Sequence, residues 1–253
     1  MARERNCEVR ITSFNGSPKG ERGNTHVMVE AFLAGAREAG AETENVFLAK
    51  KKISPCTGCN ACWMKTPGIC AQRDDMDELL AKVIGSDIAV FATPIYVDNV
   101  TGLMKNFLDR LIPIADPHWE KDENGECRHV MRHGKPSKIA VISNCGFPQQ
   151  SHFQVLRLLF RRVARNIHAD LIAEVYRDGG ALLTSPMSEL RPIVERYRDL
   201  VRQAGREVVE KSRLSAETVA KLEEPLLPSA GAVDDYMRMA NQRFDEILSK
   251  LGK

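Results

Sequence analysis

The sequence predicts an α/β fold: a doubly wound, five-stranded parallel sheet with helices on both faces and a helical C-terminal extension. Two observations lead to this prediction. Short β-branched runs alternate with longer amphipathic stretches along the 253 residues, which is typical of βαβ construction. One run, residues 88–92, is apolar throughout, as expected for a central strand buried on both faces. A chain of this length can bury a full core, so we expect one main domain.

The predicted strands and helices follow one another in regular order. In the first strand, Val9 and Ile11 alternate with polar neighbours. The predicted strands span residues 8–14, 42–48, 88–92, 138–143 and 171–175. In the first helix, Met28, Phe32 and Ala36 fall on one face. The predicted helices span residues 24–39, 74–84, 101–114, 153–167 and 188–212. In such a doubly wound sheet, ligands bind beyond the carboxyl ends of the strands.

Two segments depart from this order. Residues 116–137 are polar and rich in turn residues, so we expect an insertion loop that is functional or mobile. Residues 214–253 contain two further helical patterns but are too short for a domain of their own. We therefore divide the chain into a domain of residues 1–213 and a helical extension of residues 214–253. We expect the extension to pack across the core or onto a neighbouring subunit.

Charge and hydropathy exclude several classes of partner. Lys and Arg number 36 against 34 Asp and Glu, a net charge of +2, so the sequence predicts no nucleic acid and no anionic membrane as partner. No apolar run approaches the roughly 20 residues that span a bilayer. The first residues lead into a strand pattern without the apolar stretch of a signal peptide. We expect a cytoplasmic protein.

The loop after the first strand is built for an anion. Residues 15–25 read Asn-Gly-Ser-Pro-Lys-Gly-Glu-Arg-Gly-Asn-Thr and lead into a helix, whose N-terminus offers unpaired N–H groups. The hydroxyls of Ser17 and Thr25 and the amide of Asn24 can complete a cradle for a phosphate monoester. The segment fits neither the P-loop nor the dinucleotide-binding pattern. The alternative is a Gly-rich turn in which Asn24 is only a helix N-cap.

Two further segments carry a family resemblance. Residues 93–99 read Thr-Pro-Ile-Tyr-Val-Asp-Asn, and residues 102–110 read Gly-Leu-Met-Lys-Asn-Phe-Leu-Asp-Arg. Together with the Gly-Ser-Pro-Lys loop, these segments resemble the NADPH-dependent FMN reductase family of the flavodoxin-like fold, and most closely its iron–sulfur flavoprotein branch. The resemblance covers residues 8–175. Lys105, Asp109 and Arg110 are interpreted as a structural ion-pair set on the helix.

The resemblance implies an FMN site built from three loops. The residues implied to hold the FMN phosphate are Ser17, Lys19, Asn24 and Thr25. Those implied to lie along the isoalloxazine ring and ribityl chain are Pro94, Ile95, Tyr96 and Asn99. Those implied to form the third flavin loop are Ser143, Asn144, Cys145 and Gly146. All three segments follow strands, so their convergence on one crevice is also expected physically. For Tyr96 the alternative is an ordinary half-buried aromatic residue.

Four of the seven cysteines are crowded at Cys56, Cys59, Cys62 and Cys70. In a reducing compartment such crowding indicates metal, cluster or redox chemistry rather than structural disulfides. Thiolates separated by two intervening residues can turn around one face of a cubane cluster, and a more distant fourth ligand can complete the set. By resemblance, the four would ligate a 4Fe–4S cluster. Free or redox-active thiols, a disulfide between Cys56 and Cys59, and a zinc site remain alternatives.

The function predicted first is an FMN-dependent NAD(P)H oxidoreductase that reduces a small acceptor: a quinone, a flavin, a metal ion or a nitro compound. It requires no catalytic acid or base from the protein. The alternative is an iron–sulfur flavoprotein electron carrier that relays electrons between protein partners, ferredoxin among them. A non-catalytic FMN-binding module is a third reading.

Two further expectations concern the surroundings of the flavin. His118, Trp119, His129 and His133 either line its open face or are loop residues without a role. By resemblance, the protein is expected to be a homodimer or homotetramer.

Overall fold

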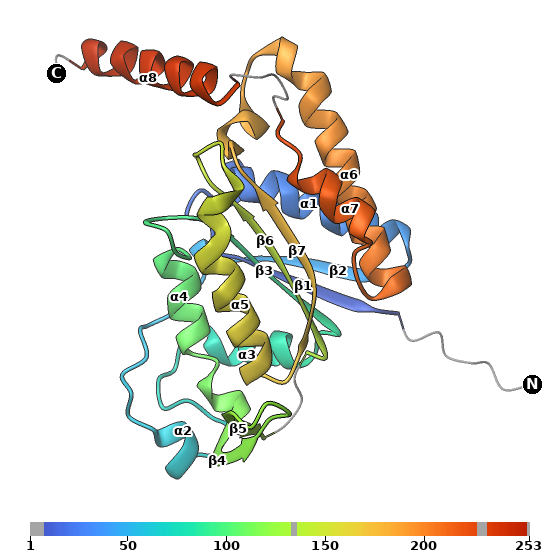
Figure 1. Cartoon of the computed structure of the whole chain (residues 1–253). Helices are drawn as coiled ribbons and strands as arrows, with labels where there is room; N and C mark the ends of the chain where they lie inside the picture. Colours follow the sequence, from blue (N-terminus) through green and yellow to red (C-terminus); the bar gives the residue numbers. More distant parts are fainter. Residues whose placement is uncertain (1–7, 133–135, 227–231, 252–253) are drawn as a thin grey trace, which may run out of the picture.

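A computed structural model describes residues 8–132, 136–226 and 232–251, and shows one five-stranded parallel sheet with the order β2-β1-β3-β6-β7 (Figure 1). The strands are β1 (Arg10–Asn15), β2 (Glu42–Phe47), β3 (Ile88–Pro94), β6 (Lys138–Asn144) and β7 (Asp170–Arg177). All four pairings between them are parallel. The predicted doubly wound sheet is therefore confirmed.

Helices cover both faces of the sheet, and a separate apolar core fills each side. One face carries α1 (Asn24–Glu38), α6 (Arg191–Lys211) and α7 (Ala216–Glu223). The other carries α3 (Met76–Ile84), α4 (Gly102–Asp109) and α5 (Gln154–Asn166). Every residue of β3 up to Thr93 is buried, as its wholly apolar run predicts for a central strand.

Two glycines let α1 and α6 cross in direct contact. A Cβ atom on Gly35 would lie 1.8 Å from the carbonyl oxygen of Arg202, and one on Gly205 would lie 1.9 Å from that of Phe32. No side chain fits at either position, because both distances are far below van der Waals contact. The close crossing fixes α6 across α1, and neither glycine was singled out from the sequence.

Residues 115–131 form a β-hairpin, which differs from the insertion loop predicted for residues 116–137. Strands β4 (Ala115–Lys121) and β5 (Cys127–Met131) pair antiparallel in a small sheet of their own. The turn between them is held by the carboxylate of Asp122, which accepts backbone N–H groups from Asn124 and Glu126 at 2.9 Å. Gly125 adopts the left-handed φ of +78° that this turn requires. The turn residues that suggested an irregular loop thus close a hairpin. His133 lies outside the described residues.

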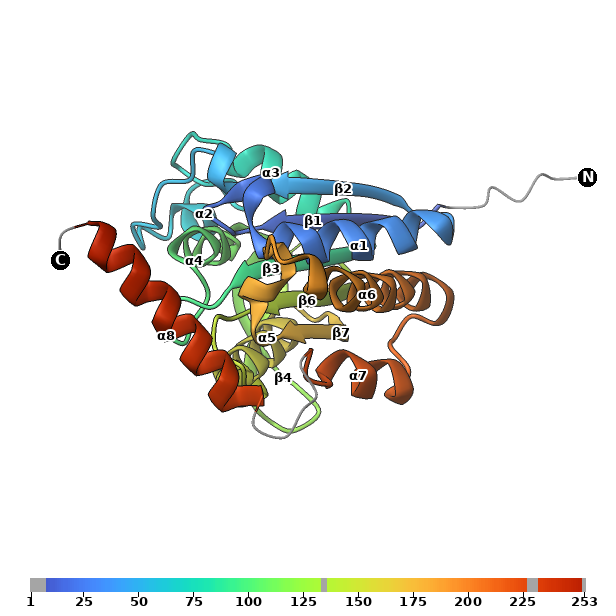
Figure 2. The same ribbon diagram turned by 90° about the horizontal axis from the view of Figure 1, so that it is seen from above.

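The two helices of the C-terminal extension differ in how they meet the rest of the protein. Helix α7 packs on α6 and β7, where the carboxylate of Glu207 accepts from the backbone of Ser215 at 2.9 Å and from the hydroxyl of Thr218 at 3.0 Å. Helix α8 (Ala232–Lys250) stands clear of the sheet beyond the carboxyl ends of its strands (Figures 1 and 2). Among the described residues, no helix has the length and apolar character needed to cross a membrane.

Candidate functional site

The loops after β1, β3 and β6 meet in one small pocket of about 130 Å³. The pocket lies at the carboxyl ends of the central strands, where the strand order reverses and doubly wound sheets bind their ligands. Ten of the twelve residues predicted to hold the cofactor line it, and Gly23 joins them. They are Ser17, Lys19, Asn24, Thr25, Pro94, Ile95, Tyr96, Asn144, Cys145 and Gly146.

The first loop folds back tightly above the end of β1. The backbone N–H of Ser17 donates to the side-chain oxygen of Asn15 at 3.0 Å, and the N–H of Lys19 lies 3.4 Å from the hydroxyl of Ser17. Gly23 is needed here, because a Cβ atom at this position would lie 2.6 Å from that hydroxyl. The loop therefore holds the buried Ser17 hydroxyl next to the start of α1.

The N-terminus of α1 is prepared for an anion. Its first turn contains no acidic side chain to oppose one. The side-chain oxygen of Asn24 accepts from the hydroxyl of Thr184 at 2.7 Å, which leaves the amide nitrogen of Asn24 as a donor. The amide of Asn144 donates to the hydroxyl of Thr25 at 2.8 Å, and this bond joins the end of β6 to the start of α1. Both polar side chains of the helix start are thus oriented by distant parts of the chain.

The second loop is a tight turn from Tyr96 to Asn99, whose backbones hydrogen-bond to each other at 3.0 and 3.2 Å. Its central residues, Val97 and Asp98, have φ angles of +49° and +55°. Positive φ at both central positions is characteristic of a type I′ turn, and it is strained for a β-branched residue such as Val97. Strain of this kind clusters at ligand-binding sites. The turn presents the half-exposed ring of Tyr96 to the pocket.

Two of the predicted residues do not line the pocket. Asn99 closes the turn just described, and its side-chain oxygen accepts from the backbone of Val100 at 2.8 Å. Ser143 is fully buried, and its hydroxyl donates to the carbonyl oxygen of Thr93 at 2.6 Å. Both side chains therefore hydrogen-bond to the backbone near the second loop.

The third loop, after β6, is tied to the end of β7. The backbone N–H of Cys145 donates to the carbonyl of Arg177 at 3.1 Å, and that of Gly180 donates to Cys145 at 2.7 Å. Burial raises the pKa of the Cys145 thiol to about 11, so this thiol stays protonated at neutral pH. The hydroxyl of Tyr236, near the start of α8, donates to the carbonyl of Gly146 at 2.9 Å. The C-terminal extension thus reaches the pocket.

These residues fit an FMN phosphate and the start of its ribityl chain. The cradle combines a helix N-terminus, a buried hydroxyl and an amide donor, with the Lys19 side chain exposed beside them. In addition, the amide nitrogen of Asn15 is buried without a hydrogen-bond partner among the described residues, so a donor is left over beneath the loop. Pro94, Ile95 and Tyr96 line the pocket beside this cradle.

The four clustered cysteines lie outside this pocket, on an irregular loop between β2 and α3 that contains the short helix α2 (Ala61–Met64). Cys56 and Cys59 are exposed, Cys62 is buried, and Cys70 is half-buried. All six described cysteines are free thiols. The loop is anchored at its far end by Trp63, whose indole N–H donates to the carbonyl of Ala115 at 3.0 Å.

The neck of the cysteine loop is closed by a buried ion pair between Arg110 and Asp74. The guanidinium donates to both carboxylate oxygens, at 2.8 and 3.0 Å, and to the carbonyl of Ser54 at 2.7 Å. The side chains are only 1% and 2% exposed. Burial raises the pKa of the Asp74 carboxyl, but hydrogen bonds from Arg110 and from the backbones of Ser54 and Met76 outweigh it and lower this pKa to about 2. Arg110 also lies beside Cys70.

The thiols of this loop are close to one another without forming a site for a single ion. Burial raises the pKa of the Cys62 thiol, and the neighbouring thiols of Cys70, Cys59 and Cys56 act in the same direction. Across the described residues, no three His, Cys, Asp or Glu side chains are close enough to hold one metal ion. A cubane cluster binds each thiolate to a different iron, so its ligands need not crowd around one point. Four thiols on one loop are the donor type of a cubane cluster and of a structural zinc site alike.

Taken together, the sheet order and the three-loop pocket at its switch point define a flavodoxin-like protein with a site for FMN. The chain belongs to the NADPH-dependent FMN reductase family, whose profile matches residues 9–168. The predicted family is therefore confirmed.

Proteins with similar sequences include several named iron–sulfur flavoproteins. An iron–sulfur flavoprotein of Archaeoglobus fulgidus is 42% identical over 137 residues, which are 54% of this chain and 61% of that protein. An iron–sulfur flavoprotein of Methanocaldococcus jannaschii is 38% identical over 106 residues, 42% of this chain and 53% of that protein. The chain thus spans about half to three-fifths of the length of these curated relatives.

Solved structures share the fold at low identity. An FMN-dependent NADH-azoreductase of Bacillus anthracis, in complex with FMN, superposes with a TM-score of 0.58 at 16% identity and covers 79% of this chain and 99% of its own. An NAD(P)H:quinone oxidoreductase of Methanothermobacter marburgensis gives a TM-score of 0.58 at 13% identity, with 79% and 97% covered. At such identities the likeness shows the fold alone.

Several residues of the site were missed by sequence reasoning. Lys105 pairs with Asp109 as expected, but Arg110 turns inward to Asp74 instead of joining them. A signal existed: Arg110 follows the buried Phe107 by three residues and therefore lies on the same helical face. Thr184 and Tyr236 had no such local signal, because their partners are distant in the sequence.

Proposed function

We propose that this protein binds FMN in the three-loop pocket and works as an NAD(P)H oxidoreductase that reduces a small acceptor. The observation that carries the proposal is the phosphate cradle, in which Ser17, Asn24 and Thr25 converge at the N-terminus of α1 while Tyr96 provides a ring wall. Family membership supports FMN as the ligand. When bound, FMN would accept a hydride from NAD(P)H and deliver electrons to the acceptor.

The protein's part in this function is binding and orientation. The α1 N-terminus and the Asn24 amide would neutralise the phosphate. Pro94, Ile95 and Tyr96 would support one side of the ring. In the third loop, the backbone N–H of Gly146 would stabilise negative charge on the ring, since that of Cys145 already donates to Arg177. The pocket opens to solvent beside the exposed Val97, so an acceptor can approach from that side.

We further propose that Cys56, Cys59, Cys62 and Cys70 hold a 4Fe–4S cluster. Support comes from the crowding of four thiols on one loop, from the closed neck at Arg110 and Asp74, and from the relatives named iron–sulfur flavoproteins. The loop lies outside the flavin pocket. This separation favours a second candidate function, an electron carrier that relays electrons between protein partners, with a donor such as reduced ferredoxin, without oxidising NAD(P)H.

One preparation tests both proposals. The protein is purified without oxygen, its visible spectrum is recorded, and iron, acid-labile sulfide, zinc and released flavin are assayed on the same sample. FMN with about four irons per chain supports both the flavin and the cluster. FMN without iron removes the cluster. A protein that takes up no FMN, even after incubation with excess FMN, overturns the central proposal.

The two candidate functions differ in the electron donor. Anaerobic bleaching of the flavin absorbance by NADH or NADPH supports the oxidoreductase. Bleaching by reduced ferredoxin, with neither nicotinamide effective, supports the carrier instead.

We also propose that the chain is a homo-oligomer, a dimer or tetramer, in which α8 pairs with α8 of a second copy. Apolar residues recur along this helix at alternating steps of four and three, the spacing of a coiled-coil seam. They are Val233, Met237, Ala240, Phe244, Ile247 and Leu251. The first turn of the helix is acidic and the last is basic, so an antiparallel pair brings opposite charges together.

The molecular mass in solution tests this pairing. Phe244→Asp is expected to dissociate the oligomer and so lower the molecular mass, since it places a charge in the seam. Met239→Asp, on the same helix but off the seam and also exposed, is the control and should leave the mass unchanged. Equal masses for both variants and the parent protein would contradict pairing through this seam.

A further inference from the structure

A second, larger cavity lies under the β4–β5 hairpin, away from the flavin pocket. Its volume is about 620 Å³, within the range of small-molecule sites. The floor is aliphatic, formed by the end of α4, the segment after it, and α5. It consists of Leu108, Leu111, Ile112, Ile114, Val163 and Ile167. None of the residues that line the flavin pocket lines this cavity.

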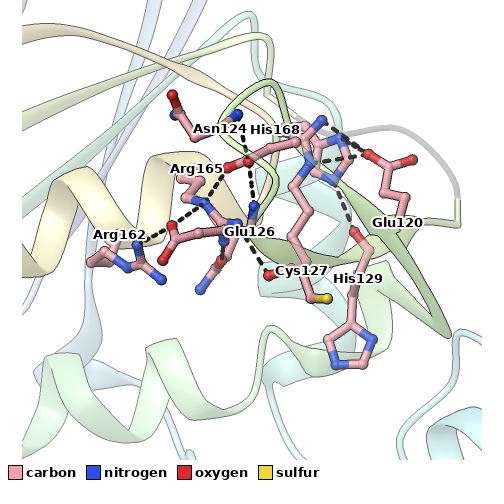
Figure 3. Close-up of polar contacts among 11 residues, drawn as sticks. Glu120, Asn124, Glu126, Cys127, His129, Arg162, Arg165 and His168 are labelled. Atoms are coloured by element: carbon pink, nitrogen blue, oxygen red, sulfur yellow. Dashed lines mark hydrogen bonds and ion pairs between the residues drawn. The ribbon is translucent and has the colours of Figure 1, made fainter.

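The roof of the cavity is held in place by polar contacts between the hairpin and α5 (Figure 3). The guanidinium of Arg165 donates to Asp122 at 2.6 Å and to the carbonyl of Cys127 at 3.1 Å, and Arg162 donates to Glu126 at 2.7 Å. The space is therefore preformed.

A further contact ties the hairpin to the end of α5. The Nε2 atom of His168 lies 2.8 Å from the carbonyl oxygen of His129, and the two residues are drawn on either side of this bond in Figure 3. The contacts with α5 and His168 thus fix the turn of the hairpin and its strand β5.

Aromatic rings form the wall of the cavity. The chain contains two tryptophans, and both line this space. The ring of His129 lies between them, with centroids 4.8 Å from Trp63 and 6.3 Å from Trp119. Trp119 remains 73% exposed, which is unusual for so large an apolar residue at a preformed cavity. Such a wall favours a flat, conjugated ring system.

The charged side chains that line the rim are all basic, and each is paired with a carboxylate outside the lining. Three arginines, Arg128, Arg162 and Arg165, line the cavity, whereas no carboxylate does. Their acidic partners Glu120, Asp122 and Glu126 lie outside the lining. A ligand with electron-rich oxygens at its edge is favoured here, because guanidinium N–H groups bind such oxygens.

We propose that this cavity binds a planar conjugated dione, a molecule of the quinone class, against the aromatic wall formed by Trp63, His129 and Trp119. Its ring would lie on the aliphatic floor and the aromatic wall, and its carbonyl oxygens would accept hydrogen bonds from the guanidinium groups at the rim. Trp63 directly follows Cys62, so the site lies against the cysteine loop. The choice of a quinone rests on the proposed oxidoreductase function, whereas the existence of a binding site does not.

Fluorescence provides a direct test, because every tryptophan of the chain reports on this one cavity. The probe is duroquinone, whose fully substituted ring does not add cysteine thiols. We expect saturable quenching of the tryptophan emission of the full-length protein, with similar affinity before and after FMN is bound. Quenching that never saturates, or that excess FMN abolishes, overturns the proposal.

A pair of variants on α5 localises the binding. Val163→Phe fills the cavity and should weaken duroquinone binding at least tenfold, whereas Val155→Phe, two turns earlier and outside the lining, should not change it. Equal affinity in the two variants excludes this cavity. Should Val163→Phe not fold, Trp119→Ala replaces it, since an exposed side chain is removed and Trp63 still reports. Unaltered affinity in Trp119→Ala likewise overturns the proposal. Because these readouts need no flavin, failure to bind FMN leaves them unaffected.

Discussion

The flavin pocket and the cysteine loop bring their candidate functional residues together in opposite ways. The pocket gathers residues from Ser17 to Gly146, yet each follows a strand of the same sheet and is fixed by hydrogen bonds before any ligand binds. The cysteines are close in sequence, but they lie on a loop with one short helix and differ widely in exposure. Nearness along the chain therefore does not by itself fix how side chains are presented, whereas the ends of parallel strands do.

The cysteine loop instead depends on a few anchors. Arg110 and Asp74 close its neck, and Trp63 fastens its far end to the hairpin. We expect the flavin pocket to survive changes that disrupt the loop, and the reverse. The following predictions test that independence.

The largest effect is expected from Arg110→Met. It leaves the carboxylate of Asp74 buried without its partner, which costs about 3–5 kcal/mol of unfolding free energy. Lys105→Met is the matched control on the same helix, because its pair with Asp109 is exposed and should contribute less than about 1 kcal/mol. Urea unfolding of both variants measures the difference. If the neck organises the cysteines, purified Arg110→Met also carries less iron while binding FMN normally.

Acid should weaken the same neck. The pKa of Asp74 is about 2 in the folded protein, below its unfolded value, so its stabilisation is complete above about pH 4 and is lost as pH falls toward 2. The expected contribution is about 2 kcal/mol. Unfolding free energies measured from pH 6 to pH 2 should fall less steeply in Asp74→Asn than in the parent protein. Parallel curves would contradict the assigned role.

In the flavin pocket, Asn24→Asp should weaken FMN binding about tenfold or more, because it sets a carboxylate beside the phosphate. Thr184→Val removes only the hydroxyl that orients Asn24, and should weaken binding less. Equilibrium titration with FMN measures both dissociation constants, and neither change should affect iron content. An unchanged affinity for FMN in Asn24→Asp would contradict the proposed phosphate cradle.

The smallest effect is expected from Tyr236→Phe. It deletes one hydrogen bond to the carbonyl of Gly146, a loss of about 1 kcal/mol, so FMN affinity should fall about two- to fivefold. Tyr197→Phe, on α6, is the control, because this hydroxyl does not line the pocket and has no hydrogen-bond partner among the described residues. Identical FMN affinities in all three proteins would show that α8 does not support the pocket.

The sequence determined the fold class, the family and most of the pocket. Strands and phosphate loops are local patterns: a wholly apolar run such as residues 88–92 has to be central, and glycines before a helix N-terminus have to leave N–H groups free. Parallel strands then place their carboxyl ends at one edge, which is why residues of three separate loops could be predicted together.

The tertiary structure alone decided what depends on contacts between distant segments. The Arg110–Asp74 neck, the bonds of Thr184 and Tyr236 to the pocket, and the α1–α6 crossing all join elements far apart in the chain. No local pattern specifies such partners, because each side chain alone is compatible with solvent exposure. The hairpin and the cavity beneath it were likewise decided by packing. Turn residues predict a turn, but the pairing of the flanking strands and the ion pairs with α5 place this hairpin over the cavity.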